Sequence, residues 1–444
     1  MSDNTFVNTL AARFENLDDL DVITQTVTRV PKSKNDIAAI PPYQIKSHIG
    51  DLLSNLYVPT SQDLALLQKL VQTARAHHDT TYQSDRQYLD GLYTHYEQFE
   101  VQQQSPICLT GPAGVGKTSL LHAMHRLLPP PTELDLNLGI GPMQLHSHWH
   151  MQVKARSTFL DLALPLIRTE LGDTNKRPAL ARAVALSAKT AFKSGVSLLI
   201  VDEMQFLTQG SSAHAAITKL LYQLSYIGKP FVFAANYSLC CALKRRPEQD
   251  RQRLLSSPVV LTPSSPDSVD WANYLRSVQH VLGESLQIDF RQERFDIYQL
   301  TAGLKRLVLQ LLKLAYDQAW QKDRRHITMS DINAAYNHTE YAVSRDQAQA
   351  MLSPHTQRSA EYTCPFPLPK VAADELIRAK NWARSKEIVA SIQRDTLLQS
   401  EKQVLESIHP PKTPKVPSAP KRAKLSVDEL RQASARRLNS ASTR

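Results

Sequence analysis

The sequence has few of the features that mark secreted, membrane-spanning or disulfide-stabilised proteins. Only four of its 444 residues are cysteines, and no two form a CxxC pair, which favours reduced thiols in a cytosolic protein. No apolar run approaches the ~18 residues that a membrane span needs. The N-terminus carries acidic residues early and has no apolar stretch of the kind found in secretory signals. Apolar residues nevertheless make up 42% of the chain, enough for a globular core.

Positive charge is concentrated at the C-terminal end. From Pro410 to Arg444 the chain has nine Lys and Arg residues against two acidic ones, so this segment carries +7 of the formal net charge of +10. A segment rich in proline and lysine cannot build a core, and we predict a disordered basic tail over 410–444. Such a tail either attracts phosphates or an acidic partner, or it only keeps the chain soluble; charge patterning leaves both open.

Glycine is scarce, with 13 residues, yet three of them lie within eight positions. The stretch GPAGVGKT at 111–118 matches the phosphate-binding pattern GxxxxGK[ST]. It stands between a short apolar strand and a segment of helical periodicity, the context that a phosphate loop requires. Lys117 would reach the β- and γ-phosphates of ATP, and the Thr118 hydroxyl would bind Mg²⁺. The predicted nucleotide-binding residues of this loop are Gly111, Pro112, Ala113, Gly114, Val115, Gly116, Lys117, Thr118 and Ser119.

Two adjacent acidic residues follow a second predicted strand. The apolar run 196–201 is typical of a parallel strand buried on both faces, and it ends in Asp202 and Glu203. At this edge Asp202 would hold Mg²⁺ through water, while Glu203 would orient and deprotonate the attacking water. An acidic residue after a strand also often caps the next helix. The upstream phosphate loop favours the first interpretation, an Mg²⁺-dependent ATPase.

The rest of the predicted core has a third and a fourth strand. The third covers 231–235 and ends at Asn236, whose amide would position the lytic water. A cationic segment at 244–253 then precedes the fourth apolar strand, PVVLTP. A metal-binding role is not favoured for His146, His148 and His150, because no Cys or carboxylate nearby completes a ligand set.

A small helical lid is predicted after the core. The segments 267–282 and 301–320 have the apolar stripe of amphipathic helices. Ser330 is a candidate N-cap for a further helix. Trp149, Trp271 and Trp320 are expected to anchor the core or the lid.

These motifs resemble those of AAA+ ATPases, and in particular the TnsC family of regulators of Tn-seven-like transposons, which is related to TniB and MuB. The resemblance covers about 40–341. It implies an α/β fold: an AAA+ P-loop ATPase with a parallel β-sheet core and a small α-helical lid. The segments that carry it are IVDEMQFL (200–207), AANYSL (234–239) and RRPEQDRQRLLSSPVVL (245–261).

The resemblance also assigns residue roles. Asn236 takes the sensor-one position, and Arg306, in a GxxR stretch that begins at Gly303, takes the sensor-two position and would approach the nucleotide from the lid. Arg253 is the first candidate and Arg251 the second for the finger that enters a neighbouring subunit's site and stabilises charge on the γ-phosphate. Each arginine could equally belong to a solvated basic helix face.

The function implied is assembly on DNA. TnsC-like proteins use ATP to form homo-oligomeric rings or helical filaments, with a hexamer or heptamer per turn, on double-stranded DNA without sequence preference. They link a target selector (TnsD or TniQ, sometimes with a CRISPR effector) to the transposase subunits TnsA and TnsB, with ATP hydrolysis as a switch, in the bacterial cytoplasm at the nucleoid. Lys154 and Arg156 are the DNA-contact candidates, although exposed loop charges explain them as well. The alternative is another DNA-associated AAA+ ATPase, such as a helicase loader or a replication initiator-like protein.

Six segments are expected along the chain. They are a polar flexible N-terminus (1–42), a helical segment (43–101), the ATPase core (102–266), the lid (267–341), a C-terminal helical extension (342–409) and the basic tail (410–444).

Overall fold

The computed structural model divides the chain into two compact units, 1–384 and 385–444. The residues that it describes are 10–32, 36–134, 142–154, 157–171, 177–204, 213–352, 363–368, 377, 378, 381 and 385. The predicted tail at 410–444, most of the extension at 342–409 and the DNA-contact candidate Arg156 therefore lie outside the described residues. Across the described part, no helix combines the length and the apolar character that crossing a bilayer requires.

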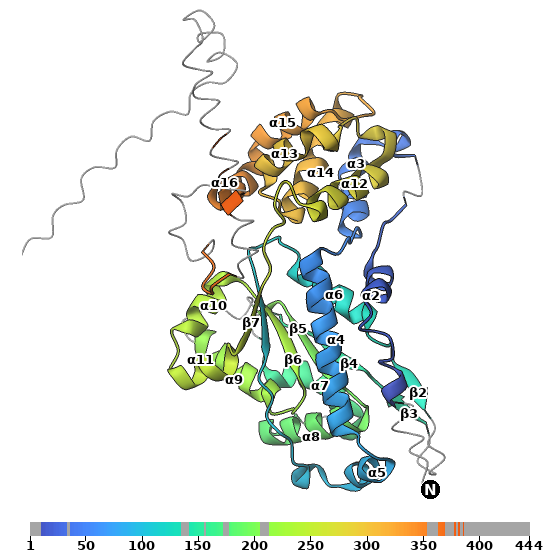
Figure 1. Ribbon diagram of the computed structural model, residues 1–444, viewed down its shortest axis with the longest axis vertical. Helices are drawn as coiled ribbons and strands as arrows, with labels where there is room; N and C mark the ends of the chain where they lie inside the picture. Colours follow the sequence, from blue (N-terminus) through green and yellow to red (C-terminus); the bar gives the residue numbers. More distant parts are fainter. Residues whose placement is uncertain are drawn as a thin grey trace, which may run out of the picture. The chain divides into compact units, whose positions relative to one another are not determined.

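A parallel sheet forms the centre of the first unit (Figure 1). Each of its four neighbouring strand pairs is parallel. This confirms the predicted α/β fold class. Two strands match their predicted ranges, 107–110 and 231–235. The strand predicted at 196–201 begins two residues later and ends one residue later. In sheet order the strands are β4 (His148–Gln152), β5 (Leu198–Asp202), β6 (Phe231–Ala235), β1 (Ile107–Thr110) and β7 (Ser257–Val260).

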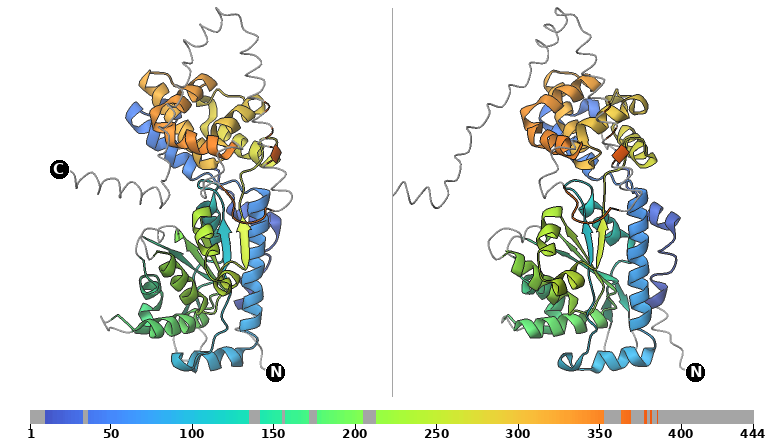
Figure 2. Two further views of the ribbon diagram at one scale, coloured as in Figure 1. Left: turned by 90° about the vertical axis from the view of Figure 1, so that its left-hand side faces the viewer. Right: turned by 60° about the vertical axis from the view of Figure 1, so that its left-hand side comes forward.

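Helices cover both faces of this sheet (Figure 2). Alternate residues of β5 enter two different cores, Leu198 and Ile200 one of them and Leu199 and Val201 the other, as expected for a strand buried on both sides. The first face carries α2 (Leu20–Val27), α4 (Ser61–Thr81) and α6 (Lys117–Leu127). The second carries α7 (Phe159–Leu171), α8 (Leu180–Lys193), α9 (Ala213–Ser225), α10 (Tyr237–Lys244) and α11 (Glu248–Leu254).

Helices alone form the lid. Its core contains Trp271 and Trp320, both fully buried as expected, and Trp149 is buried in the sheet core. The Trp320 indole N–H donates to the carbonyl of Ile40 over 3.0 Å, which ties the lid to a segment far upstream. The lid helices are α3 (Pro42–Ser54), α12 (Val269–Leu282), α13 (Phe290–Thr301), α14 (Lys305–Gln321), α15 (Met329–Asn337) and α16 (Ala342–Leu352).

The N-terminal third of the chain packs differently from what its expected division into segments implies. In the range 1–42, expected to be flexible, Phe14, Ile23 and Val27 are fully buried against the sheet core. The helical segment 43–101 contributes to two cores, because α3 packs in the lid and α4 on the sheet. The last α-helix of this segment is α5 (Asp85–Tyr93). Further along the chain, β2 (Thr132–Leu134) and β3 (Met143–Leu145) pair antiparallel in a small sheet of their own.

Two helix starts in the lid were predicted wrongly. The helix expected at 301–320 begins at Lys305, because α13 ends at Thr301 and the chain then turns through left-handed conformations at Ala302 (φ 51°) and Gly303 (φ 70°). The cap of α15 is Thr328 rather than Ser330. The Asp331 carboxylate accepts from both the backbone N–H and the hydroxyl of Thr328, each over 3.0 Å, and so holds the start of α15.

Candidate nucleotide site

The loop between β1 and α6 has the backbone shape of a phosphate loop. Gly114 and Gly116 adopt φ values of 84° and 119°, which residues with a Cβ rarely reach, and Gly116 directly precedes α6. Since the first backbone N–H groups of a helix have no partner within it, the start of α6 is a favourable place for an anion. The sequence pattern and the backbone geometry therefore agree on this loop.

Lys117 lies over its own loop. Its ammonium donates to the carbonyl oxygens of Gly111 (2.8 Å) and Pro112 (3.0 Å). Burial lowers the pKa of Lys117 to about 8, and the nearby carboxylates of Asp202 and Glu203 only partly offset this effect. A partly desolvated ammonium of this kind gains from an anionic ligand.

Asp202 and Glu203 lie where β5 ends. Asp202 is 1% exposed; its Oδ1 accepts from the backbone N–H of Glu203 (2.7 Å), whereas its Oδ2 is buried with no hydrogen-bond partner among the described residues. Glu203 has a φ of 63°, a strained conformation of the kind that gathers at functional sites. Its carboxylate contacts the Thr118 hydroxyl, and burial, followed by the charge of Asp202, raises the pKa of Glu203.

These residues fit a magnesium ion. A buried carboxylate oxygen without a partner is costly unless a cation or water completes it. Mg²⁺ prefers oxygen ligands and usually keeps several waters and substrate phosphates around one or two protein groups. The Thr118 hydroxyl and the Asp202 carboxylate are of this chemistry.

Asn236 is placed at the end of β6, the strand next to β5. Its side-chain oxygen accepts from the backbone N–H of Leu239 (2.9 Å) and from the hydroxyl of Ser238 (3.0 Å), so it caps α10. The predicted contact with a lytic water is therefore left to the amide nitrogen.

Arg306 lies directly against the phosphate loop. A Cβ added at Gly114 would lie 3.0 Å from the Cβ and the Nε of Arg306. The Arg306 guanidinium donates to the side-chain oxygen of Gln347 (3.1 Å), and the Gln347 amide donates to the carbonyl of Ala113 (2.8 Å). Gln347 thus links the predicted sensor-two arginine to the loop. Gln347 has no signal in the sequence, because α16 carries no motif and lies in the range expected to be a C-terminal extension.

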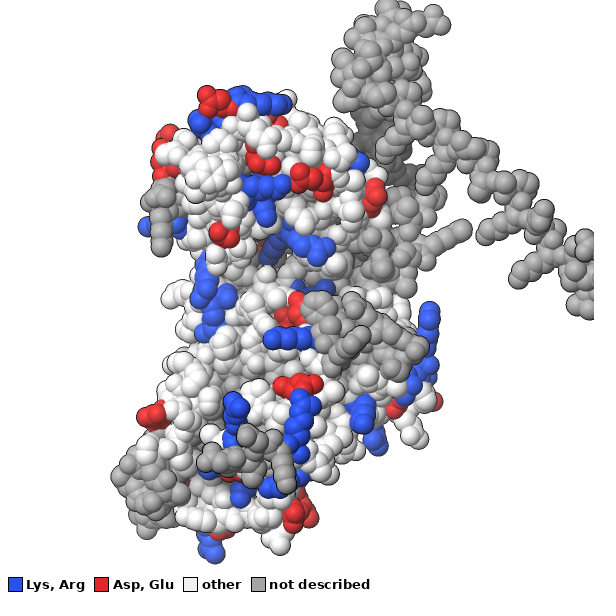
Figure 3. Space-filling model, turned by 180° about the vertical axis from the view of Figure 1, so that it is seen from behind, with Lys and Arg blue, Asp and Glu red and all other residues white. Residues whose placement is uncertain are grey.

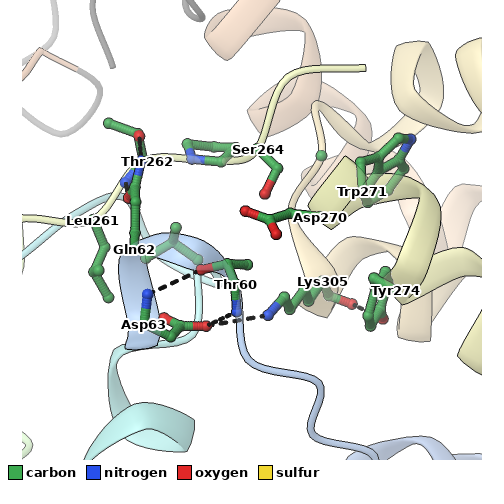
Figure 4. A pocket seen from close by; sticks show the side chains of 13 residues that line it. Thr60, Gln62, Asp63, Leu261, Thr262, Ser264, Asp270, Trp271, Tyr274 and Lys305 are labelled. Atoms are coloured by element: carbon green, nitrogen blue, oxygen red, sulfur yellow. Dashed lines mark hydrogen bonds and ion pairs between the residues drawn. The ribbon is translucent and has the colours of Figure 1, made fainter. Parts of the chain in front are cut away.

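A second contact between the lid and the rest of the first unit lies beside the phosphate loop, around a cavity of about 20 Å³ (Figure 4). Gln62 and Thr262 exchange two hydrogen bonds, through the Gln62 amide (2.8 Å) and the Thr262 backbone N–H (3.2 Å). Lys305 of the lid lies 3.7 Å from the Asp63 carboxylate. Since 20 Å³ holds about one water, the start of α4 packs closely here against both the segment that follows β7 and the lid. No motif in the sequence indicated these side chains.

The remaining candidates lie on the surface. Arg251 and Arg253 are exposed on the last turn of α11, and Lys154 is exposed just after β4. On the face drawn in Figure 3, Lys and Arg side chains are spread in small groups, several of them beside acidic side chains. The roles of the three residues stay predictions.

Histidines gather between β4 and α6. His125 Nδ1 and His148 Nε2 are 2.6 Å apart, and the ring of His150 lies 5.3 Å from that of His125 and 5.6 Å from that of His122. Burial lowers the pKa of His148 to about 3 and also lowers those of His125 and His150. The His148 ring is therefore uncharged at neutral pH. Among the described residues, no group of three or more His, Cys, Asp or Glu side chains is placed to hold a metal ion.

Part of the chain matches a known family model. Residues 100–240 match the family model described as an AAA domain, a span that contains the phosphate loop, Asp202, Glu203 and Asn236. The phosphonates import ATP-binding protein PhnC 1 of Pseudomonas syringae pv. tomato is 33% identical over 66 residues, which are 15% of this chain and 25% of that protein. The chain thus matches a quarter of the length of this relative. Residues 100–240 are therefore similar to an AAA domain.

Several solved structures show a likeness at low sequence identity. Cdc6p from Pyrobaculum aerophilum has 14% identity and a TM-score of 0.37, over 52% of this chain and 59% of that one. The ORC2 protein of Aeropyrum pernix, in its ADPNP and ADP complexes, has 15% identity and a TM-score of 0.41, over 66% and 70%. The ORC1 protein of Aeropyrum pernix, in complex with DNA, has 17% identity and a TM-score of 0.36, over 56% and 63%.

Proposed function

We propose that this protein hydrolyses ATP with Mg²⁺ and uses the reaction to control its own assembly on double-stranded DNA, as a TnsC-like regulator of transposition. The proposed ATP hydrolysis rests on three groups at one site. They are the phosphate loop, the Asp202 oxygen that has no partner among the described residues, and the Glu203 carboxylate beside the Thr118 hydroxyl. Loop and acidic pair lie at the carboxyl ends of β1 and β5, the edge where open parallel sheets bind ligands.

Each residue has a distinct part in the reaction. The loop N–H groups and Lys117 bind the phosphates, and Thr118 and Asp202 hold Mg²⁺, which when bound neutralises phosphate charge. Glu203 accepts the proton of the attacking water. Its raised pKa suits this role, because a more basic carboxylate is the better proton acceptor. Arg306, held by Gln347, adds a positive charge from the lid.

The DNA and transposition part rests on the sequence motifs and on charge. Outside the tail the net charge is small, so affinity for DNA comes from many subunits that each make few phosphate contacts. Lys154 supplies such a contact, and Arg253 or Arg251 completes the site of the neighbouring subunit. The selector TnsD or TniQ and the transposase subunits TnsA and TnsB are the proposed protein partners, with the basic tail recruiting the transposase.

The decisive test of the ATPase uses Glu203→Gln in the full chain. We expect normal ATP binding, a hydrolysis rate lower by ~10²-fold or more, and an assembly on duplex DNA that persists with ATP in analytical ultracentrifugation. Glu284→Gln, an exposed change in the lid, is the matched control and should hydrolyse ATP at the parental rate. Parental turnover by Glu203→Gln would disprove its role as the base.

The finger is tested by mixing two inactive variants. Arg253→Ala keeps an intact pocket, and Glu203→Gln keeps an intact arginine, so mixed oligomers should regain hydrolysis at the interfaces that pair the two. Arg276→Ala, an exposed arginine on α12, should be active alone. If no activity returns, the same mixture is made with Arg251→Ala. Failure of both, or a protein that stays monomeric with ATP and DNA, would reject the shared site.

The tail and the partners need separate measurements. Deletion of the residues after Pro410 should leave ATP hydrolysis unchanged and lower transposition in a reconstituted reaction. Unchanged transposition would reject recruitment by the tail. A pull-down that returns the replicative helicase, and no transposase, would favour a helicase loader instead.

A further inference from the structure

A buried lysine lies at the edge of the sheet opposite the phosphate loop. Lys229 lies just before β6 and is only 3% exposed. Its ammonium lies 5.4 Å from the ring centre of Tyr82 and 5.8 Å from that of Phe192. Among the described residues the ammonium has neither an acidic partner nor a hydrogen-bond acceptor. A buried charge in this state is costly, and it is rarely retained without a ligand or partner.

Lys229 lines a cavity of about 380 Å³, which we name the Lys229 pocket. Its volume lies within the range of small-molecule sites, about 300–1,000 Å³. Hydroxyl and amide groups line one part of it, and the rings of Phe99 and Phe192, 5.0 Å apart, line another. The polar lining includes Thr80, Thr81, Gln87 and Gln102.

The wall of the pocket is tightly packed where the aromatic side chains meet. A Cβ at Gly91 would lie 2.4 Å from the Phe192 ring, so no larger residue fits at position 91 without displacing that ring. The Tyr82 hydroxyl donates to the Phe192 carbonyl (2.8 Å), which fixes the ring over which the ammonium lies. The aromatic wall beside the Lys229 side chain is therefore held in place before any ligand arrives.

The charges around the pocket select the ligand. Burial lowers the pKa of His77, the other basic group in the lining, to about 3, so Lys229 is the one cation that the described lining offers at neutral pH. Glu100, exposed at the lining, disfavours anions of high charge. One desolvated ammonium, several hydrogen-bond donors and an aromatic wall suit a monoanion with an apolar body. Burial also lowers the pKa of Lys229 to about 7, and a bound anion would restore the charged form.

We propose that the Lys229 pocket binds a small organic monocarboxylate, with the carboxylate on the Lys229 ammonium and the apolar body against Phe99 and Phe192. This site is separate from the nucleotide site and does not depend on the proposed ATPase. The inference stands on the cavity, on the lack of an acidic partner for the Lys229 ammonium among the described residues, and on the chemistry of the lining.

Isothermal titration calorimetry on the full chain at neutral pH tests the proposal, with benzoate as the probe. Benzyl alcohol and inorganic phosphate serve as the neutral and the small polar comparison. We expect saturable 1:1 binding of benzoate. Benzyl alcohol should bind at least about tenfold more weakly, since it cannot form the charge-assisted hydrogen bond. Phosphate should also bind at least about tenfold more weakly, because it has no apolar body to place against the aromatic wall. Lys229→Met retains the length and the apolar contacts of the side chain and should lose at least about tenfold in affinity. Lys69→Met, an exposed change on α4, should bind as the parent.

Two results would overturn the proposal: no saturable heat with benzoate, or equal affinity of the parent and Lys229→Met. If Lys229→Met fails to fold by circular dichroism, Gln87→Trp is used instead, because a bulky ring in the lining blocks the cavity and leaves Lys229 intact. Unchanged benzoate affinity of that variant would likewise reject the site.

Discussion

Replacement of Lys117 by methionine should stabilise the protein in the absence of nucleotide while it abolishes ATP binding. Burial lowers the pKa of Lys117 from 10.5 to about 8. Because the folded state holds this proton less tightly than the unfolded state, the charged lysine destabilises the fold at every pH below about 8. The penalty shrinks as the pH rises from about 8 to 10.5 and is absent above that range.

The size of the effect follows from two opposing terms. A lowering of the pKa from 10.5 to about 8 corresponds to a cost of about 3 kcal/mol at neutral pH. Methionine removes this cost but also removes the hydrogen bonds to the carbonyls of Gly111 and Pro112, worth together about 2 kcal/mol. We therefore expect Lys117→Met to raise the free energy of unfolding by about 1 kcal/mol at neutral pH.

Urea unfolding monitored by circular dichroism measures this difference, at neutral pH and again near the ordinary lysine pKa. The advantage of Lys117→Met should disappear at the higher pH, and Lys322→Met, an exposed change at the end of α14, should show no such trend. With ATP and Mg²⁺ at about 100 times the dissociation constant, the parent should gain about 2.7 kcal/mol and the variant nothing. A variant less stable than the parent at neutral pH, or a difference independent of pH, would refute the reasoning.

Three further predictions concern the lid. Gln347→Ala removes the hydrogen bond that holds Arg306 and should raise the KM for ATP about fivefold in steady-state kinetics, since about 1 kcal/mol is lost; an unchanged KM would contradict this link. Asp331→Asn should lower the free energy of unfolding by about 1–2 kcal/mol, because the carboxylate caps α15 and pairs with Arg324. The pKa of Asp331 is lowered in the fold, so this difference should be present at neutral pH and decrease as the pH falls below 3.8; a difference that persists in acid would argue against the ion pair. Trp320→Phe leaves the Ile40 carbonyl without its donor and should cost about 2 kcal/mol in thermal unfolding; an unchanged midpoint would show that the contact is dispensable.

The phosphate loop and the strands around it could be predicted because their signals are local. A loop that needs positive φ at two positions requires glycines there, and strands buried on both faces must be continuously apolar. Asp202 ends one such strand, and Glu203 and Asn236 directly follow two of them, so their place at one edge of the sheet follows from parallel pairing alone.

Helix starts in the lid were harder to predict, because the apolar stripe continues across a break. Thr301 and Lys305 lie in one periodic pattern, yet the turn at Ala302 and Gly303 separates two helices. Near Ser330, two residues of capping chemistry compete, and Thr328 prevails because Asp331 stands three positions later.

The sequence alone determined that the chain folds around a parallel sheet and carries the loop and acidic pair of a nucleotide site, since these depend on residues close together in the chain. Only the tertiary structure decided which distant residues join them. Gln347 donates a hydrogen bond to the phosphate loop, and the Ile40 carbonyl accepts one from Trp320. The Lys229 ammonium lies against two aromatic rings and has no acidic partner among the described residues. The physical reason is that such contacts arise from packing between separate elements, which leaves no periodic or spacing signal in the sequence.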